Sequence, residues 1–235
     1  MGADHKLRVN NRTHTLHFSG RAFPCDRDIE TALQWNNHAL LLSSDTDCLS
    51  LWDREGLVRL TRVGVYPQDM AIHGDTAVVC GGANGRIHLL TLPNLHATAE
   101  YDVPGLPERV ALHGNTACLL SLMADDDIQT MLLMLDLHRG TYQELARFSG
   151  LPGAITASNT GLWIGIGEML LHIPHGRTEA DLLIEGFGLV HRIEVQEDGV
   201  LITDPLEGMI AHVTQTPRPA IEVLYRGDVG QYAFS

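Results

Sequence analysis

The chain has 235 residues, which is enough to bury the core of one large domain or two small ones. Its 29 acidic and 16 basic residues give a net charge of −13, which disfavours nucleic acid and anionic membrane surfaces as partners. With 44% apolar and 19% charged residues, the composition is that of a folded globular protein rather than a disordered one.

The N-terminal residues and the cysteines indicate the cellular compartment of the protein. The first ten residues lack the apolar core of a secretory signal, and no apolar stretch approaches the roughly 20 residues of a membrane span. The four cysteines form neither a CxxC pair nor a zinc-ligand spacing, and they are Cys25, Cys48, Cys80 and Cys118. We expect free, mostly buried thiols and a cytoplasmic location, unless a signal peptide has been removed from the sequence.

A phrase of about twelve residues recurs along the chain. It reads YPQDMAIHGDTA from Tyr66 and LPERVALHGNTA from Leu106, with weaker copies elsewhere. The second residues of the six copies are Ile29, Pro67, Pro107, Pro152, Val190 and Val229. They lie 38 to 45 residues apart, so the chain is about six repeats, one of them split between the two termini.

Each repeat contains short apolar runs typical of β-strands, and no convincing amphipathic helix occurs. In chain order, the split repeat is expected to place strands at Lys6–Asn10 and Thr13–Phe18, with an inner strand at Gln231–Phe234. The repeat after Tyr66 predicts strands at Met70–His73, Thr76–Cys80, Arg86–Leu92 and Ala97–Val103. The repeat after Leu189 predicts Ile193–Gln196, Gly199–Thr203, Met209–Thr214 and Ile221–Tyr225. Asn84-Gly85 is a strong hairpin signal between the second and third runs.

Glycines mark the repeat boundaries. One glycine is expected to follow the last strand of each repeat, and the six are Gly20, Gly64, Gly105, Gly150, Gly188 and Gly227. Four strands per unit of about 40 residues is the period of a β-propeller blade. We therefore predict an all-β fold, a single β-propeller domain over residues 1–235, with six blades of about four antiparallel strands and one blade shared by the termini. A five-bladed propeller with an N-terminal extension is the alternative.

Two passages resemble known propeller repeats. Ala77-Val-Val-Cys-Gly-Gly and Ile87-His-Leu-Leu-Thr, preceded by Val63-Gly-Val-Tyr-Pro67, resemble the YVTN-type, surface-layer-like repeats. Leu49-Ser-Leu-Trp-Asp53 resembles the end of a WD-repeat. The resemblance implies a propeller fold, in families that bind proteins, ligands or cofactors and that include some enzymes, so it does not fix the function.

The channel face of the predicted propeller carries the candidate site. There, the loops that enter each first strand lie beside the hairpins that join second and third strands. The candidate ligand-binding residues on these loops are Gln68, Asp69, Glu108, Arg109, Arg192 and Gln231. The candidate metal ligands are Glu30, Asp69, Glu108 and Asp204, whose carboxylates suit Ca²⁺, and His191 is a candidate general base.

The same acids are also explained as solvated loop residues or as partners of Arg109 and Arg192. No nucleophile elbow, phosphate-binding loop or metal-ligand spacing occurs elsewhere in the chain. We therefore expect a non-catalytic propeller that binds a partner protein or a small ligand at its channel face and needs no cofactor. The alternative is a calcium-dependent enzyme that would resemble the lactonases or lyases built on six blades.

Overall fold

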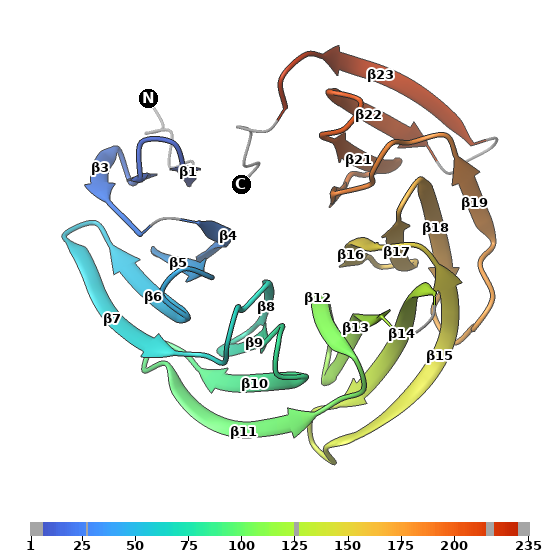
Figure 1. Ribbon diagram of the computed structural model, residues 1–235. Helices are drawn as coiled ribbons and strands as arrows, with labels where there is room; N and C mark the ends of the chain where they lie inside the picture. The colour runs from blue at the N-terminus through green and yellow to red at the C-terminus, as the bar shows by residue number, and fades with distance from the viewer. Residues whose placement is uncertain (1–6, 27, 125–126, 215–218, 230–235) are drawn as a thin grey trace. The chain divides into compact units, whose positions relative to one another are not determined.

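The computed structural model describes residues 7–26, 28–124, 127–214 and 219–229, and these residues form antiparallel β-sheets joined by turns (Figure 1). The first sheet contains β1 (Arg8–Asn10), β2 (Thr15–Phe18) and β3 (Arg21–Pro24). The second contains β4 (Ile29–Trp35), β5 (His38–Ser43), β6 (Cys48–Asp53) and β7 (Gly56–Arg62). The third contains β8 (Asp69–His73), β9 (Thr76–Cys80), β10 (Arg86–Thr91) and β11 (His96–Asp102).

Three further four-stranded sheets follow in the same order. The fourth contains β12 (Leu106–His113), β13 (Thr116–Ala124), β14 (Ile128–Asp136) and β15 (Thr141–Ser149). The fifth contains β16 (Pro152–Ala157), β17 (Gly161–Ile166), β18 (Met169–Pro174) and β19 (Leu182–Glu185). The sixth contains β20 (Arg192–Val195), β21 (Gly199–Asp204), β22 (Met209–Thr214) and β23 (Ala220–Arg226). The fold is an all-β, six-bladed β-propeller, so the prediction from the repeats is confirmed.

The first sheet is a blade rather than an extension, so the five-bladed alternative is wrong. In the second and third blades, the residue after the fourth strand donates its amide proton to the second–third hairpin: Val63 to Asp47 and Val103 to Gly85, both at 2.9 Å. Cys25 donates to His14 in the same way at 2.9 Å. β1, β2 and β3 therefore correspond to the second, third and fourth strands of a blade.

This assignment corrects one glycine marker. Gly20 does not follow the last strand of its repeat, because it lies in the tight turn between β2 and β3 with φ at +74°. The strand Arg21–Pro24 was not expected, since its four residues carry no alternating apolar pattern and only Phe23 and Ala22 are apolar besides the proline. The predicted inner strand at Gln231–Phe234 lies outside the described residues.

The second and third strands of each blade hold the core. β5 is buried from Ala39 onward and β17 is buried throughout, so both read as continuous apolar runs because each face packs on a neighbouring sheet. Apolar clusters join adjacent blades, as where Leu40 and Leu51 pack with Val79. Each such leucine contributes roughly 1.5–3 kcal/mol relative to exposure.

Four of the exposed fourth strands contain a β-bulge. One residue of each of four such strands is skipped in the pairing with the third strand, and these residues are Val58, Thr98, Leu145 and Leu224. A β-bulge of this kind bends and twists a strand. The bulges therefore discourage edge-to-edge pairing with another chain, although every residue of β23 is exposed.

The chain divides into two compact units, whose boundary falls between Glu108 and Arg109 inside β12. The first unit carries β1 to β11 and the second carries β13 to β23. That residues 1–235 act as a single domain stays a prediction. The four cysteines all lie in the described ranges and form no disulfide. Within those ranges there is also no helix with the length and apolar character needed to cross a bilayer.

Candidate functional site

The two ends of each blade differ in their connections. The turns between first and second strands, and between third and fourth strands, lie at one end of the sheet, which we call the turn end. The second–third hairpin and the linkers to neighbouring blades lie at the other end, which we call the linker end. The predicted site residues that fall in the described ranges all lie at the linker ends of their blades.

In the first unit, two candidate metal ligands accept hydrogen bonds from hydroxyl groups. The Ser44 hydroxyl donates to Glu30 at 2.6 Å. The Thr31 hydroxyl on β4 donates to Asp69 on β8 at 2.9 Å, which links the first strands of two neighbouring blades. Gln68 donates from its side-chain amide to the Tyr66 carbonyl at 3.3 Å. These contacts give the side chains structural roles.

In the second unit, the structure brings together Arg109, His191 and Arg192. Arg109 donates from Nε to the Gly153 carbonyl at 2.7 Å, which ties β12 to β16. Desolvation lowers the pKa of His191, and the positive charges of Arg109 and then Arg192 lower it further. The surroundings of His191 are thus locally cationic. The proposed base would be neutral at pH 7, and its proposed catalytic role stays a prediction.

This arrangement predicts a measurable titration. The His191 ring should protonate below the usual histidine value of about 6.5. Arg109→Gln should raise its pKa, and Arg192→Gln should raise it less. Because the unfolded chain binds the proton first as the pH falls, this histidine should make the folded state less stable below about pH 6.5. NMR titration of the ring checks this, and a midpoint that neither variant moves would contradict it.

Asp204 is the most fully satisfied of the predicted metal ligands. Its side chain is completely buried at the end of β21. Oδ2 accepts the Gly188 amide at 2.6 Å, and Oδ1 accepts the amides of Leu189, Leu206 and Glu207, each at 3.1 Å. The carboxylate therefore fastens the linker before β20 to the hairpin after β21, a role that sequence reasoning missed because backbone amides leave no pattern in the sequence.

The other predicted ligands are placed as follows. Glu108 lies on β12, half-buried, and Gln231 lies outside the described residues. Over the ranges 7–26, 28–124, 127–214 and 219–229, no three His, Cys, Asp or Glu side chains are grouped so as to hold a metal ion. The calcium site stays a prediction.

A second hydrogen-bonded group, not anticipated from the sequence, lies at the turn end of the fifth blade. His172 is 1% exposed and packs on Trp163, with ring centroids 4.6 Å apart. Its Nδ1 lies 2.7 Å from Asp181, and its Nε2 lies 3.1 Å from the Thr160 hydroxyl. Because a carboxylate only accepts, Nδ1 carries the proton and donates it to Asp181.

This order of hydroxyl, imidazole and carboxylate is that of a nucleophile with its base. The amides of Thr160 and Gly161, which flank the hydroxyl, both donate to the Ser158 hydroxyl at 3.2 Å. They are therefore already engaged, and neither is free to stabilise an oxyanion. The imidazole is also buried under Trp163. The group is therefore best explained as structural: it holds the turn at Thr160 to the long connection between β18 and β19, which ends at Asp181.

Exposed apolar side chains distinguish the linker ends. Six large ones lie there: Val65 (45% exposed), Tyr66 (61%), Leu106 (37%), Ile128 (54%), Leu151 (48%) and Leu206 (71%). Leu106 and Ile128 are the first residues of β12 and β14, and the other four lie in linkers or hairpins. Of the other ten among the described residues, nine lie within the fourth strands and Val195 ends β20 at the turn end. The described turns of the turn end carry none, and typical sequences there are Asn36-Asn37 and Gly74-Asp75.

No protein-family model matches the chain, and no curated protein matches it either. Solved structures do. Kuenenia stuttgartiensis hydrazine synthase is 10% identical, with 90% of this chain and 76% of that chain covered and a TM-score of 0.71. The WD40 β-propeller domain of Doa1 is 11% identical, covering 84% and 71%, with a TM-score of 0.67. The β-propeller domain of Cps50 (Swd1) from Myceliophteria thermophila is 13% identical, covering 84% and 74%, with a TM-score of 0.61.

At these identities the likeness shows the fold alone, a β-propeller. Membership of the YVTN-type family stays a prediction, because no family model matches.

Proposed function

We propose that this chain is a non-catalytic β-propeller that binds a partner protein through the linker ends of its blades. The observation that carries the proposal is that the linkers and hairpins at the linker ends carry exposed apolar side chains, whereas the described turns at the opposite ends carry none. Exposed apolar groups rimmed by polar residues are typical of interaction surfaces, and loops on a rigid β-scaffold are where binding residues concentrate.

The charge of the linker ends indicates the chemistry of the partner. Exposed acids also lie at the linker ends: Asp26, Asp28, Asp45, Asp127, Glu168, Glu207 and Asp228. With a net charge of −13, this favours a partner surface that combines apolar and basic side chains. Such complementarity speeds association and weakens as ionic strength rises.

Affinity capture from cell extract tests this proposal with matched variants. Tyr66→Glu and Leu206→Glu each place a charge on the proposed surface and should lower the captured partner at least tenfold, about 1.4 kcal/mol. Leu183→Glu is the control, because Leu183 is 54% exposed on β19, away from the linker end. The proposal fails if both linker-end variants still capture the partner, or if the control variant captures as little of it as they do.

The calcium-dependent enzyme is the less favoured proposal. Both oxygens of Asp204 already accept backbone amides, and His191 lies beside two arginines whose charge would repel a divalent cation. The observations at the linker ends therefore favour protein binding over metal-assisted catalysis.

A further inference from the structure

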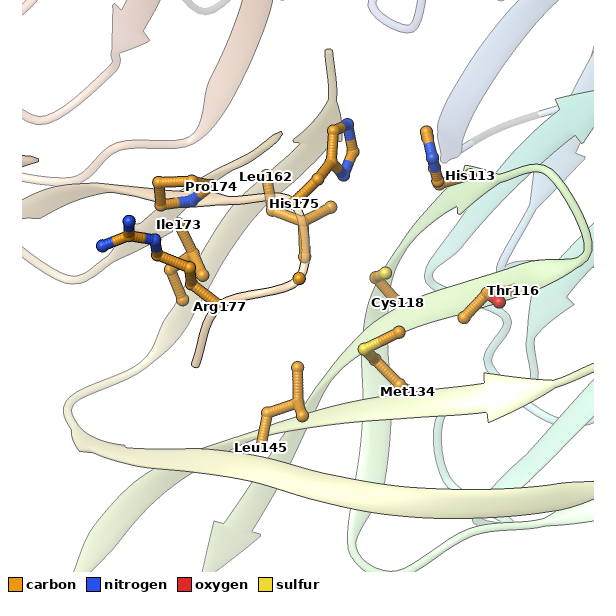
Figure 2. A pocket seen from close by; sticks show the side chains of 11 residues that line it. His113, Thr116, Cys118, Met134, Leu145, Leu162, Ile173, Pro174, His175 and Arg177 are labelled. Carbon is orange, nitrogen blue, oxygen red and sulfur yellow. The ribbon is translucent and has the colours of Figure 1, made fainter. Parts of the chain in front are cut away.

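A small cavity opens at the turn end of the second unit, between the fourth and fifth blades (Figure 2). Its volume is about 80 Å³. The interior is lined by Cys118 and Met134 from the fourth blade, Leu145 from its bulged outer strand, and Leu162 and Ile173 from the fifth blade. Burial raises the pKa of the Cys118 thiol to about 12, so this lining is uncharged at neutral pH. The interior therefore suits an aliphatic group.

The rim of the cavity is polar and carries basic groups. The rings of His113 and His175 stack with centroids 4.1 Å apart and an interplanar angle of 30°. His175 donates from Nε2 to the Ser158 carbonyl at 2.9 Å, which fixes its ring. Figure 2 shows the two imidazoles facing each other on one side of the cavity, and Arg177 on the side of Pro174 with its guanidinium turned away from them.

The charge at this rim differs from that of the rest of the chain. Arg177 and two histidines line the cavity and no carboxylate does, although acids outnumber Lys and Arg by 29 to 16 in the sequence. Arg177 forms no side-chain hydrogen bond or ion pair with the described residues, so its charge is available to a ligand. The rim therefore favours an anion.

A strand of the first unit shows how this position can be filled. The first strand of the second blade ends in Trp35, whose indole donates to the Gly74 carbonyl at 2.8 Å and packs on the cluster that contains Leu92 and Leu95. In the second unit the corresponding strand, β12, ends in His113. An imidazole fills less volume than an indole, so His113 leaves space that a tryptophan would occupy.

We propose that this cavity binds a short aliphatic carboxylate, with its alkyl group inside and its carboxylate at the rim on the side of Arg177. A volume of about 80 Å³ suits a short alkyl chain such as that of butanoate. The proposal does not depend on partner binding, because the cavity lies at the opposite end of the blades from the linkers.

A series of straight-chain carboxylates from acetate to octanoate tests the proposal. Binding is followed by NMR of the methyl groups of Met134, Leu145, Leu162 and Ile173 in the full chain. Each added methylene should tighten binding roughly fourfold up to about butanoate. Longer acids should gain little affinity, because the apolar interior of the cavity is then full. Butanamide should bind more weakly than butanoate, and Arg177→Gln should remove that difference.

Two further variants complete the test. His113→Trp should fill the mouth, as Trp35 does in the first unit, and abolish the methyl shifts, whereas Arg139→Gln, an exposed turn variant in the same blade, should leave them unchanged. The proposal is overturned if no saturable shifts occur with any acid. It is equally overturned if affinity climbs without a break to octanoate and His113→Trp has no effect, since that describes nonspecific adsorption.

Discussion

Replacing Asp204 with alanine is expected to lower the free energy of unfolding by about 3 to 5 kcal/mol, because four amides lose a charged, fully buried acceptor. For a chain of this length the melting temperature should fall by roughly 6 to 20 °C. Asp204→Asn should cost less, since one oxygen can still accept the three bonds made by Oδ1 while the new amide group faces the Gly188 amide. Thermal and urea unfolding of the two variants check this order.

The control for Asp204 lies in an equivalent hairpin. Asp45 follows β5 as an exposed acid, so Asp45→Ala should change stability by no more than about 0.5 kcal/mol. The structural role is contradicted if Asp204→Ala melts like the wild type. If added calcium raised the melting temperature of the wild type but not of Asp204→Asn, the metal-ligand hypothesis would replace it.

Replacing His172 with alanine is expected to cost about 2 to 4 kcal/mol, because it opens a cavity beside Trp163 and leaves Asp181 and Thr160 without their common partner. The loss should also loosen the connection between β18 and β19, which Asp181 helps to close. Unfolding experiments together with amide exchange across residues 175–181 measure both effects.

An exposed histidine supplies the comparison for that variant. His138 lies in the turn between β14 and β15, and His138→Ala should be nearly neutral. If His172→Ala and His138→Ala had the same free energy of unfolding, the structural role of His172 would be contradicted. If Thr160 were instead a nucleophile, Thr160→Ala would abolish an activity while leaving stability almost unchanged.

The fold could be predicted from the sequence because its repeats are spaced like blades and its buried strands are continuous apolar runs. Asn84-Gly85 lies where a hairpin was expected, and Gly64 follows β7 as its marker required. Gly20 misled because a glycine with positive φ serves a tight β-turn as well as a blade boundary. Residues Arg21–Pro24 form a strand through pairing with β2, which supplies the hydrogen bonds that local propensity does not indicate.

The candidate site was less predictable than the fold. Acids near strand ends, such as Glu30 and Asp204, resemble ligands in a sequence. Their hydrogen-bond partners are a hydroxyl and backbone amides, which only the folded chain brings near. His172 and Asp181 are joined by a long connection without regular secondary structure, so no fixed sequence spacing predicts that they form a pair. Exposure is likewise set by packing, and Leu206 is as apolar as the buried leucines yet is 71% exposed.

Hydrogen–deuterium exchange of the chain with and without its captured partner tests the central claim most directly. The account predicts slower exchange in peptides covering the linkers at residues 64–68, 104–107 and 150–152 when the partner is bound. Peptides covering the turns at residues 36–37, 74–75 and 114–115 should exchange as in the free protein. Protection confined to those turns or to the fourth strands would contradict binding through the linker ends.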